Sequence, residues 1–146
     1  KKENITIDEE AEEFVLLICN NSIRLLINYL EKFKLLNKAI NIKNATNICT
    51  NISFYEFKKY TYLWLNEKNV KDASQTILDI YKKGYSVIDI FDTYFNFIKL
   101  NKEINEELKY KIIKIILKYI SLFYTLHENE IELIFFTNDL IKLNDA

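Results

Sequence analysis

Few side chains in this sequence are of a type and spacing that could carry out chemistry. His127 is the only histidine, so a metal site with several histidines is excluded, and no motif supplies an activated nucleophile for a catalytic pair. Cys19 and Cys49 are the only cysteines and lack the spacing of metal ligands. We therefore expect no catalytic or metal-binding residue: His127 should face solvent or cap a helix, and the cysteines should be reduced thiols of an intracellular protein.

Gly84 is the only glycine, and the chain has no proline. A phosphate-binding P-loop needs two glycines before its lysine, and a dinucleotide-binding turn needs three, so neither motif can be present. Turns between hairpin strands usually need glycine or proline, which disfavours an all-β fold. Gly84 itself follows two lysines and precedes Ser86, a pattern that predicts one helix ending and another beginning.

Arg24 is the side chain best suited to contact a charged ligand. A guanidinium keeps its charge and can bind two phosphate oxygens through parallel N–H bonds. Arg24 is also the only arginine in its stretch, whereas lysines dominate elsewhere. The alternative is a surface arginine paired with Glu12 or Glu13 of the preceding helix, and the residues alone favour that alternative.

The composition is that of a packed protein. Hydrophobic residues make up 49% and charged residues 28% of the chain, which is enough to build a core. The net charge of −1 creates no overall attraction to nucleic acid or anionic lipid. The most apolar stretch, residues 112–123, is interrupted by two lysines, so we expect no membrane span. The chain begins with neither a signal-peptide pattern nor Met, and we expect it to be a fragment.

Signals for helices recur along the whole chain. Capping-box patterns at residues 6–9 (TIDE) and 53–56 (SFYE) each predict the start of a helix. We expect helices from residue 6, over about 22–37, 53–67, 70–83, 86–100 and 105–126, a last helix from residue 128 or 129, and one further helical turn at 45–49. The polar segment 37–44 is expected to be a loop. The sequence therefore predicts an all-α fold with seven or eight helices.

The spacing of apolar residues predicts which side of each helix is buried. The expected buried positions are Phe14, Leu17 and Ile18; Ile23, Leu26, Ile27, Leu30, Phe33 and Lys34; Phe57, Tyr60, Thr61 and Trp64; Ala73, Ile77, Ile80 and Tyr81; and Ile90, Phe91, Tyr94 and Phe97.

The longest expected helix, residues 105–126, is apolar on two sides. One side carries residues that alternate at spacings of four and three: Leu108, Ile112, Ile115, Tyr119 and Leu122. A second apolar side lies beside it, and a narrow strip with Lys111, Lys114 and Lys118 completes the circumference. Such a helix is usually enclosed by its neighbours. Two interpretations stay open: burial at the centre of the bundle, or partial use of the first side as an interface with another subunit.

From Glu10 onward the order of elements resembles the back half of a clamp-loader ATPase subunit, most closely a small subunit of eukaryotic replication factor C. Residues 21–30 (NSIRLLINYL) are similar to the family's Gly-Asp-x-Arg-x-x-x-Asn-x-Leu helix, and residues 81–90 (YKKGYSVIDI) to its linker between two collar helices. Residues 107–109, 112–116 and 132–133 match weaker family patterns. Two departures are visible: Asn21-Ser22 replace Gly-Asp, and residues 126–130 lack the usual Glu-Gly and form a shorter loop.

The resemblance implies a small helical lid at residues 1–50, as in AAA+ ATPases, and a five-helix collar at residues 51–146 that joins five subunits into a ring. Arg24 would then reach the γ-phosphate of ATP in the intact subunit. The fragment itself would bind no cofactor and be no enzyme. The full-length parent would use ATP and magnesium, together with other clamp-loader subunits, to load a sliding clamp onto primer–template DNA in the nucleus.

Other functions stay open beside this one. A helical protein–protein interaction adaptor unrelated to an ATPase fits the two-sided helix equally well. The aromatic residues between 54 and 64, beside Lys58 and Lys59, could form a groove that stacks nucleic-acid bases, although aromatics at helical spacing more often form a core. The lysine strip of the long helix could face an acidic partner or lipid, or simply solvent.

Overall fold

The computed structural model describes residues 5–19, 22–49 and 52–143. These residues form eight helices: α1 (Glu9–Cys19), α2 (Ile23–Leu36), α3 (Ile42–Cys49), α4 (Phe54–Leu65), α5 (Val70–Lys82), α6 (Val87–Leu100), α7 (Glu106–Leu122) and α8 (Ile131–Leu143). The prediction of an all-α fold is confirmed. None of the described helices is long and apolar enough to cross a membrane.

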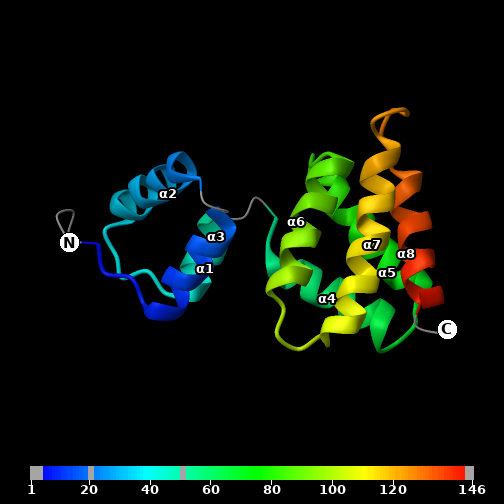
Figure 1. Ribbon diagram of the computed structural model, residues 1–146, viewed down its shortest axis with the longest axis horizontal. Helices are drawn as coiled ribbons and strands as arrows, with labels where there is room; N and C mark the ends of the chain where they lie inside the picture. Colours follow the sequence, from blue (N-terminus) through cyan, green and yellow to red (C-terminus); the bar gives the residue numbers. More distant parts are fainter. Residues whose placement is uncertain (1–4, 20–21, 50–51, 144–146) are drawn as a thin grey trace. The chain divides into compact units, whose positions relative to one another are not determined.

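The chain divides into two compact units, Lys1–Ser53 and Phe54–Ala146. Figure 1 shows α1 to α3 in the first unit and α4 to α8 in the second. The division falls close to the boundary between residues 50 and 51 that the sequence suggested for a lid and a collar. Each unit has its own core, so each is described separately.

In the first unit, α1 and α3 pack against each other, and α2 packs against both. The predicted cap at Thr6 is wrong. The carbonyl of Thr6 accepts a hydrogen bond from the amide of Ile40 (2.9 Å), and Ile40 in turn accepts one from the amide of Asp8 (3.0 Å). This short parallel contact between Ile7 and Ile40 keeps the chain extended, so α1 begins only at Glu9.

The predicted buried side of α1 is only partly correct. Phe14 is buried, but Leu17 is exposed and Ile18 half-buried, whereas Val15 and Cys19 are buried. Residues 14–18 are all apolar, so their spacing could not identify which of them faces α3.

The bounds predicted for α2 are confirmed. Ser22 Oγ accepts a hydrogen bond from the amide of Leu25 (3.4 Å), and Asn37 ends the helix in the left-handed conformation. The predicted buried side is wrong at Ile23 and Ile27, which are exposed, while Phe33 is buried. The expected loop at 37–44 is shorter than predicted, because Asn41 Oδ1 accepts from the amide of Asn44 (2.9 Å) and α3 begins at Ile42.

In the second unit, local capping sets the helix starts that the sequence predicted. Asn69, Ser86 and Asn105 each accept a hydrogen bond from the amide three residues further on, at 3.1, 3.0 and 2.7 Å. Gly84 follows α5 with φ +96°, a conformation that disfavours every residue with a Cβ. The predicted turn between two helices at this glycine is confirmed.

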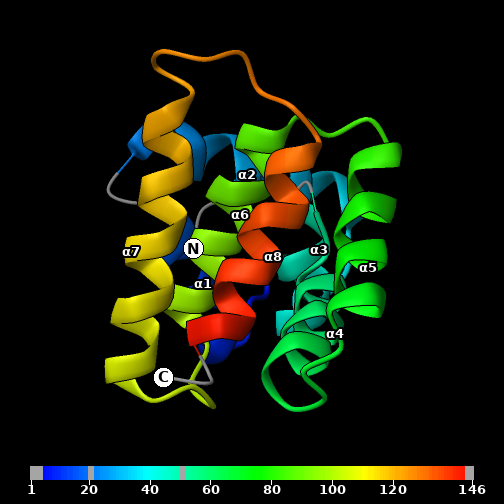
Figure 2. The ribbon, with the colours of Figure 1, turned by 90° about the vertical axis from the view of Figure 1, so that its right-hand side faces the viewer.

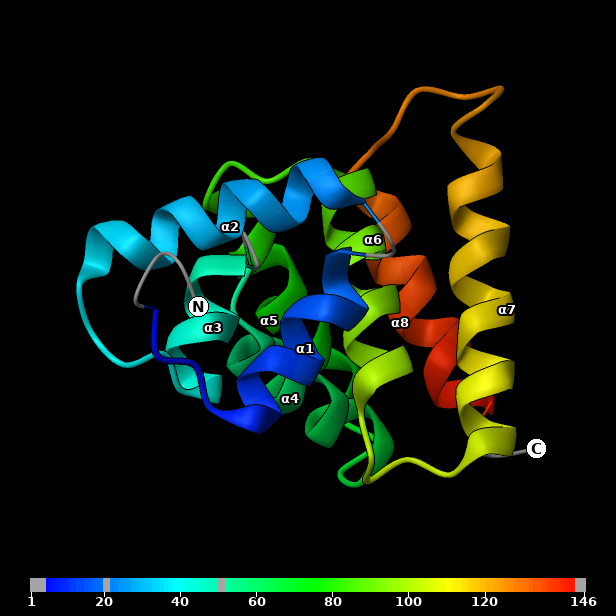
Figure 3. The ribbon, with the colours of Figure 1, turned by 60° about the vertical axis from the view of Figure 1, so that its left-hand side comes forward.

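The five helices of the second unit form a bundle in which α8 packs against α5, α7 and α4. Figure 2 shows α8 between α7 and α5, with α6 behind it. α7 packs against α6 and α8 and lies at the edge of this unit, as Figure 3 shows. The prediction that α7 is enclosed at the centre is therefore wrong, since only one side of this helix contributes to the core.

Three aromatic residues of α4, Phe57, Tyr60 and Trp64, belong to the core of the second unit, whereas Tyr55 and Tyr62 are exposed. Phe57, Tyr60 and Trp64 have no exposed surface, and the Tyr60 and Phe57 rings contact the Tyr94 ring at 5.4 and 5.2 Å between centroids. Trp64 Nε1 donates a hydrogen bond to the Tyr94 hydroxyl (3.0 Å), which also bonds Thr61 Oγ1 (3.0 Å). Because Phe57, Tyr60 and Trp64 are buried, they cannot stack nucleic-acid bases, so the groove that the sequence left open is not formed by these three residues.

Candidate functional site

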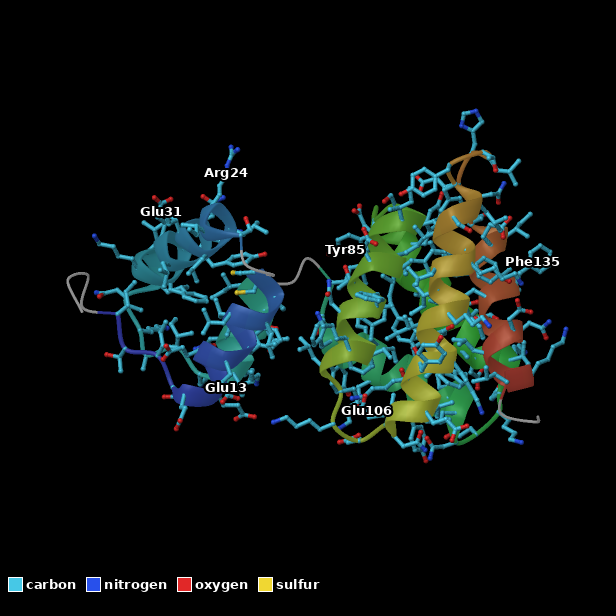
Figure 4. The ribbon with its side chains drawn as sticks, in the orientation of Figure 1. Glu13, Arg24, Glu31, Tyr85, Glu106 and Phe135 are labelled. Atoms are coloured by element: carbon cyan, nitrogen blue, oxygen red, sulfur yellow. The ribbon has the colours of Figure 1, made fainter. Side chains whose placement is uncertain are left out.

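Arg24 lies in the first turn of α2 and is exposed. Figure 4 shows its side chain extending away from the helices of its unit, whereas Glu13 lies well away from it on α1. Among the described residues, Arg24 makes no ion pair with Glu12 or Glu13, so the pairing that the sequence suggested as an alternative is not formed. The guanidinium is thus presented to solvent from the start of a helix.

A hollow of about 380 Å³ lies beside this turn, and it is lined by Leu16, Cys19, Ser22, Ile23 and Leu26. Most of these side chains are apolar. The hollow therefore suits an apolar group of a neighbouring polypeptide and offers no set of donors for a phosphate.

The two cysteines provide no reactive thiol. Both are free and buried. Burial raises the pKa of the Cys19 thiol, and burial together with the nearby Cys19 raises the pKa of Cys49 to about 12. Both thiols are thus protonated at neutral pH, and a thiol is a poor nucleophile and a poor metal ligand. Within the described residues, no group of three or more His, Cys, Asp or Glu could hold a metal ion.

The five predicted interface residues of α7 do not share one environment. Ile112 and Tyr119 are buried in the core of the second unit, and their contact with another subunit stays a prediction. The Tyr119 hydroxyl donates to Asp139 of α8 (2.9 Å), and its ring lies 5.9 Å from that of Phe91. The other three, Leu108, Ile115 and Leu122, are half-buried.

The most exposed apolar side chains of α7 lie on its opposite side. Tyr110 and Leu117 are 72% and 52% exposed, and their spacing of seven residues places them on one side of the helix with Lys114 between them. The flanking lysines make ion pairs: Lys111 with Glu107 (2.8 Å) and Lys118 with Asp139 (3.1 Å). We call Tyr110, Lys114 and Leu117 the outer stripe of α7.

α8 extends the exposed apolar surface of the second unit. Ile131, Ile134 and Phe135 are exposed, and Figure 4 shows Phe135 pointing away from the bundle. Sequence reasoning named Lys114 but missed the exposed residues of α8 and the two apolar residues of the outer stripe. The only signal was the seven-residue spacing of Tyr110 and Leu117, which a helix that is apolar on several sides obscures.

A comparison with known families finds a match within the second unit. Residues 58–121 match the family described as the replication factor C C-terminal domain. The match runs from α4 into α7, so it lies within the second unit and leaves α8 and the first unit outside. No curated protein matches the chain.

The match agrees with the resemblance found in the sequence and with the helical bundle. It also argues against an adaptor unrelated to a clamp loader. Residues 58–121 of the second unit are therefore similar to the C-terminal domain of a replication factor C, or clamp-loader, subunit.

Proposed function

We propose that the second unit is the collar that joins this subunit to other clamp-loader subunits in a five-membered ring. The first unit would be the lid that couples the ATP state to assembly. In the full-length parent, these parts would serve the ATP- and magnesium-dependent loading of a sliding clamp onto primer–template DNA in the nucleus. The family match within residues 58–121 supports this proposal.

The observation that carries the proposal is the exposed apolar surface on α7 and α8 of the matched unit. Tyr110 and Leu117 lie on α7, and Ile134 and Phe135 lie on α8, which packs against α7. Large apolar side chains that gather on an exposed surface indicate contact with another protein. The half-buried Leu108, Ile115 and Leu122 stay candidates for the edge of this contact.

The test is reconstitution of the complex from the full-length parent and its four partner subunits. The double change Tyr110→Glu and Leu117→Glu puts two charges on the outer stripe and should remove the subunit from the complex, as measured by gel filtration with light scattering. The control is Tyr62→Glu, an exposed tyrosine of α4. Incorporation of the double variant at the level of the wild type would contradict the proposed contact.

We also propose that Arg24 contacts the γ-phosphate of ATP in the intact subunit. Its exposed position at the start of α2 and the two parallel N–H bonds of a guanidinium support this role. Arg24→Ala in the full-length protein should lower ATP-dependent clamp loading while the subunit still assembles. Arg24→Lys keeps the charge but not the two parallel bonds, so it should restore only part of the activity. Unchanged loading by the alanine variant would rule out the role.

A further inference from the structure

The segment that joins α7 to α8, residues 123–130, presents exposed apolar side chains in acidic surroundings. Tyr124 is 88% and Leu126 is 59% exposed, and both lie outside any helix. From residue 119 to residue 141 the sequence contains four acidic residues and no lysine or arginine. We call residues 123–130 the α7–α8 loop. Its composition differs from that of α7, whose outer surface is lysine-rich.

Contacts at both ends hold the α7–α8 loop in place. At its start, the Phe123 ring stacks on the Phe91 ring of α6, with 6.1 Å between centroids and 19° between planes. Near its end, Glu128 Oε2 accepts a hydrogen bond from the amide of Ile88 in the first turn of α6 (3.1 Å). A carboxylate is favoured there, because the start of a helix carries unpaired N–H groups and partial positive charge. The loop is therefore attached to α6 twice.

Two further bonds shape the loop from within. The amide of Leu126 donates to the carbonyl of Leu122 (2.9 Å), which continues the last turn of α7. Asn129 Oδ1 accepts from the amide of Ile131 (3.0 Å) and caps the start of α8. Tyr124 and Leu126 therefore project from a backbone that is held between these contacts.

An exposed tyrosine and leucine on a held backbone are well suited to binding another protein. Large side chains that enter a pocket of a partner supply most of the affinity of an interface. Binding also costs less conformational entropy when the loop is already ordered. The apolar surface continues onto α8 through Ile131 and Phe135, which are both exposed.

The charges around these side chains indicate what kind of partner fits. Glu130 is exposed and Glu132 is half-buried, next to the apolar residues of the loop and of α8. Nucleic acid is disfavoured, because residues 119–141 contain four carboxylates and no lysine or arginine to bind its phosphates. A partner with basic side chains around an apolar centre would gain from both features.

We propose that the α7–α8 loop and the first turns of α8 bind an amphipathic helix of a partner protein, with lysines or arginines flanking its apolar side. Tyr124 and Leu126 contact the apolar side, Glu130 and Glu132 face the basic side chains, and Glu128 is a positioning residue that fixes the loop on α6. This surface does not include the outer stripe of α7, but it shares Phe135 with the surface proposed for ring assembly, so the test uses the isolated chain, where no ring forms.

The test uses this 146-residue chain and two designed fluorescent peptides. One is an amphipathic helix of leucines and lysines, and the other replaces every lysine with glutamate. We expect fluorescence anisotropy to show binding of the lysine peptide, weakening with added salt, and no binding of the glutamate peptide. The double change Tyr124→Ala and Leu126→Ala should weaken binding at least about tenfold. Tyr62→Ala, an exposed tyrosine on α4, is the matched control and should bind as the wild type.

Two further sets of variants separate contact from positioning. Glu130→Lys with Glu132→Lys should exchange the preference, so that the glutamate peptide binds better than the lysine peptide. Glu128→Ala should weaken binding, whereas Glu128→Gln, which keeps an oxygen that accepts from Ile88, should bind nearly as the wild type. Equal binding of both peptides by the wild type, or wild-type affinity in the Tyr124 and Leu126 double variant, would overturn the inference.

Discussion

Replacing Tyr94 by Phe removes one oxygen atom from the core of the second unit and tests how its buried hydrogen bonds stabilise the fold. The Tyr94 hydroxyl accepts from Trp64 Nε1 and bonds Thr61 Oγ1, both at 3.0 Å, and all three side chains are buried. In the variant, the indole N–H loses its acceptor, and a buried donor without a partner costs about 1–3 kcal/mol. The loss at Thr61 adds about 1 kcal/mol. We expect the free energy of unfolding to fall by about 2–4 kcal/mol.

Tyr60→Phe is the matched control, because it deletes the same atom type from the same core. The Tyr60 hydroxyl bonds Thr137 Oγ1 (2.8 Å), but Thr137 also donates to the carbonyl of Leu133 (2.8 Å) and keeps that bond in the variant. Only the net worth of one hydrogen bond is lost, about 0.5–1.5 kcal/mol. The two phenylalanine variants should therefore differ clearly, with Tyr94→Phe the less stable.

The difference in stability can be measured by intrinsic fluorescence, because Trp64 is the only tryptophan in the chain and has no exposed surface. Tryptophan fluorescence during urea unfolding follows the second unit alone, because Trp64 belongs to it. The free energies of unfolding can be compared if the variants and the wild type show the same dependence of this free energy on urea concentration. Equal losses in the two variants would refute the reasoning, since they would show that Trp64 and Thr61 find other partners.

Three more outcomes follow from the backbone and from buried titratable groups. Gly84→Ala should cost about 1–2 kcal/mol by the same fluorescence assay, because φ is +96° while an added Cβ meets nothing within 4 Å, and a variant as stable as the wild type would contradict this. Cys19 and Cys49 should react slowly with a thiol reagent at neutral pH and quickly in denaturant, because burial raises the pKa of both thiols. Burial also raises the pKa of Tyr60 and Tyr94, so their phenols stay protonated in the folded state when unfolded phenols ionise near pH 10. The free energy of unfolding should therefore be at its full value below about pH 10 and fall above it, by up to about 1.4 kcal/mol per pH unit for each phenol. Urea midpoints that stay constant above about pH 10 would contradict the raised pKa values.

Most of the second unit could be predicted because its signals are local. Asn69, Ser86 and Asn105 each bond an amide three residues further on, so the start of each helix depends on four consecutive residues. The buried side of α4 was also predictable, because Phe57, Tyr60 and Trp64 recur at helical spacing and the lysines beside Phe57 mark the opposite side as polar.

Prediction failed where apolar residues surround a helix or where a distant segment intervenes. Val15 rather than Leu17 enters the core of the first unit, because α3 packs on that side of a fully apolar stretch. The extended contact of Thr6 with Ile40 delays the start of α1, and the capping pattern carries no information about a partner more than thirty residues away. Both errors arise from tertiary packing that overrides a local preference.

The candidate site also depends on tertiary contacts that the sequence does not reveal. The spacing of Ile112 and Tyr119 identified an apolar side of α7 correctly but could not tell core from interface, because both need the same residue types. Nothing local connects Glu128 with Ile88, forty residues earlier, although this bond fixes the α7–α8 loop. Arg24 was singled out by its chemistry, and its surface position agrees with the alternative that the residues allowed, but the sequence could not show that Glu12 and Glu13 leave it unpaired.

α7 separates the residues that fold the second unit from those available for assembly. Ile112, Ile116 and Tyr119 fill the core, whereas Tyr110 and Leu117 on the outer stripe stay exposed. Substitution of exposed residues away from caps and ion pairs usually changes stability by less than about 0.5 kcal/mol. The Tyr110→Glu and Leu117→Glu double variant should therefore unfold at the urea midpoint of the wild type, even though we expect it to be lost from the complex.

Ile116→Ala provides the opposite case, because this side chain has no exposed surface and its truncation leaves a cavity that costs about 2–5 kcal/mol. It should lower the midpoint strongly. If the double variant at Tyr110 and Leu117 instead lowered the urea midpoint as much as Ile116→Ala, its absence from the complex would reflect unfolding, and the outer stripe of α7 would belong to the core rather than to a contact between subunits.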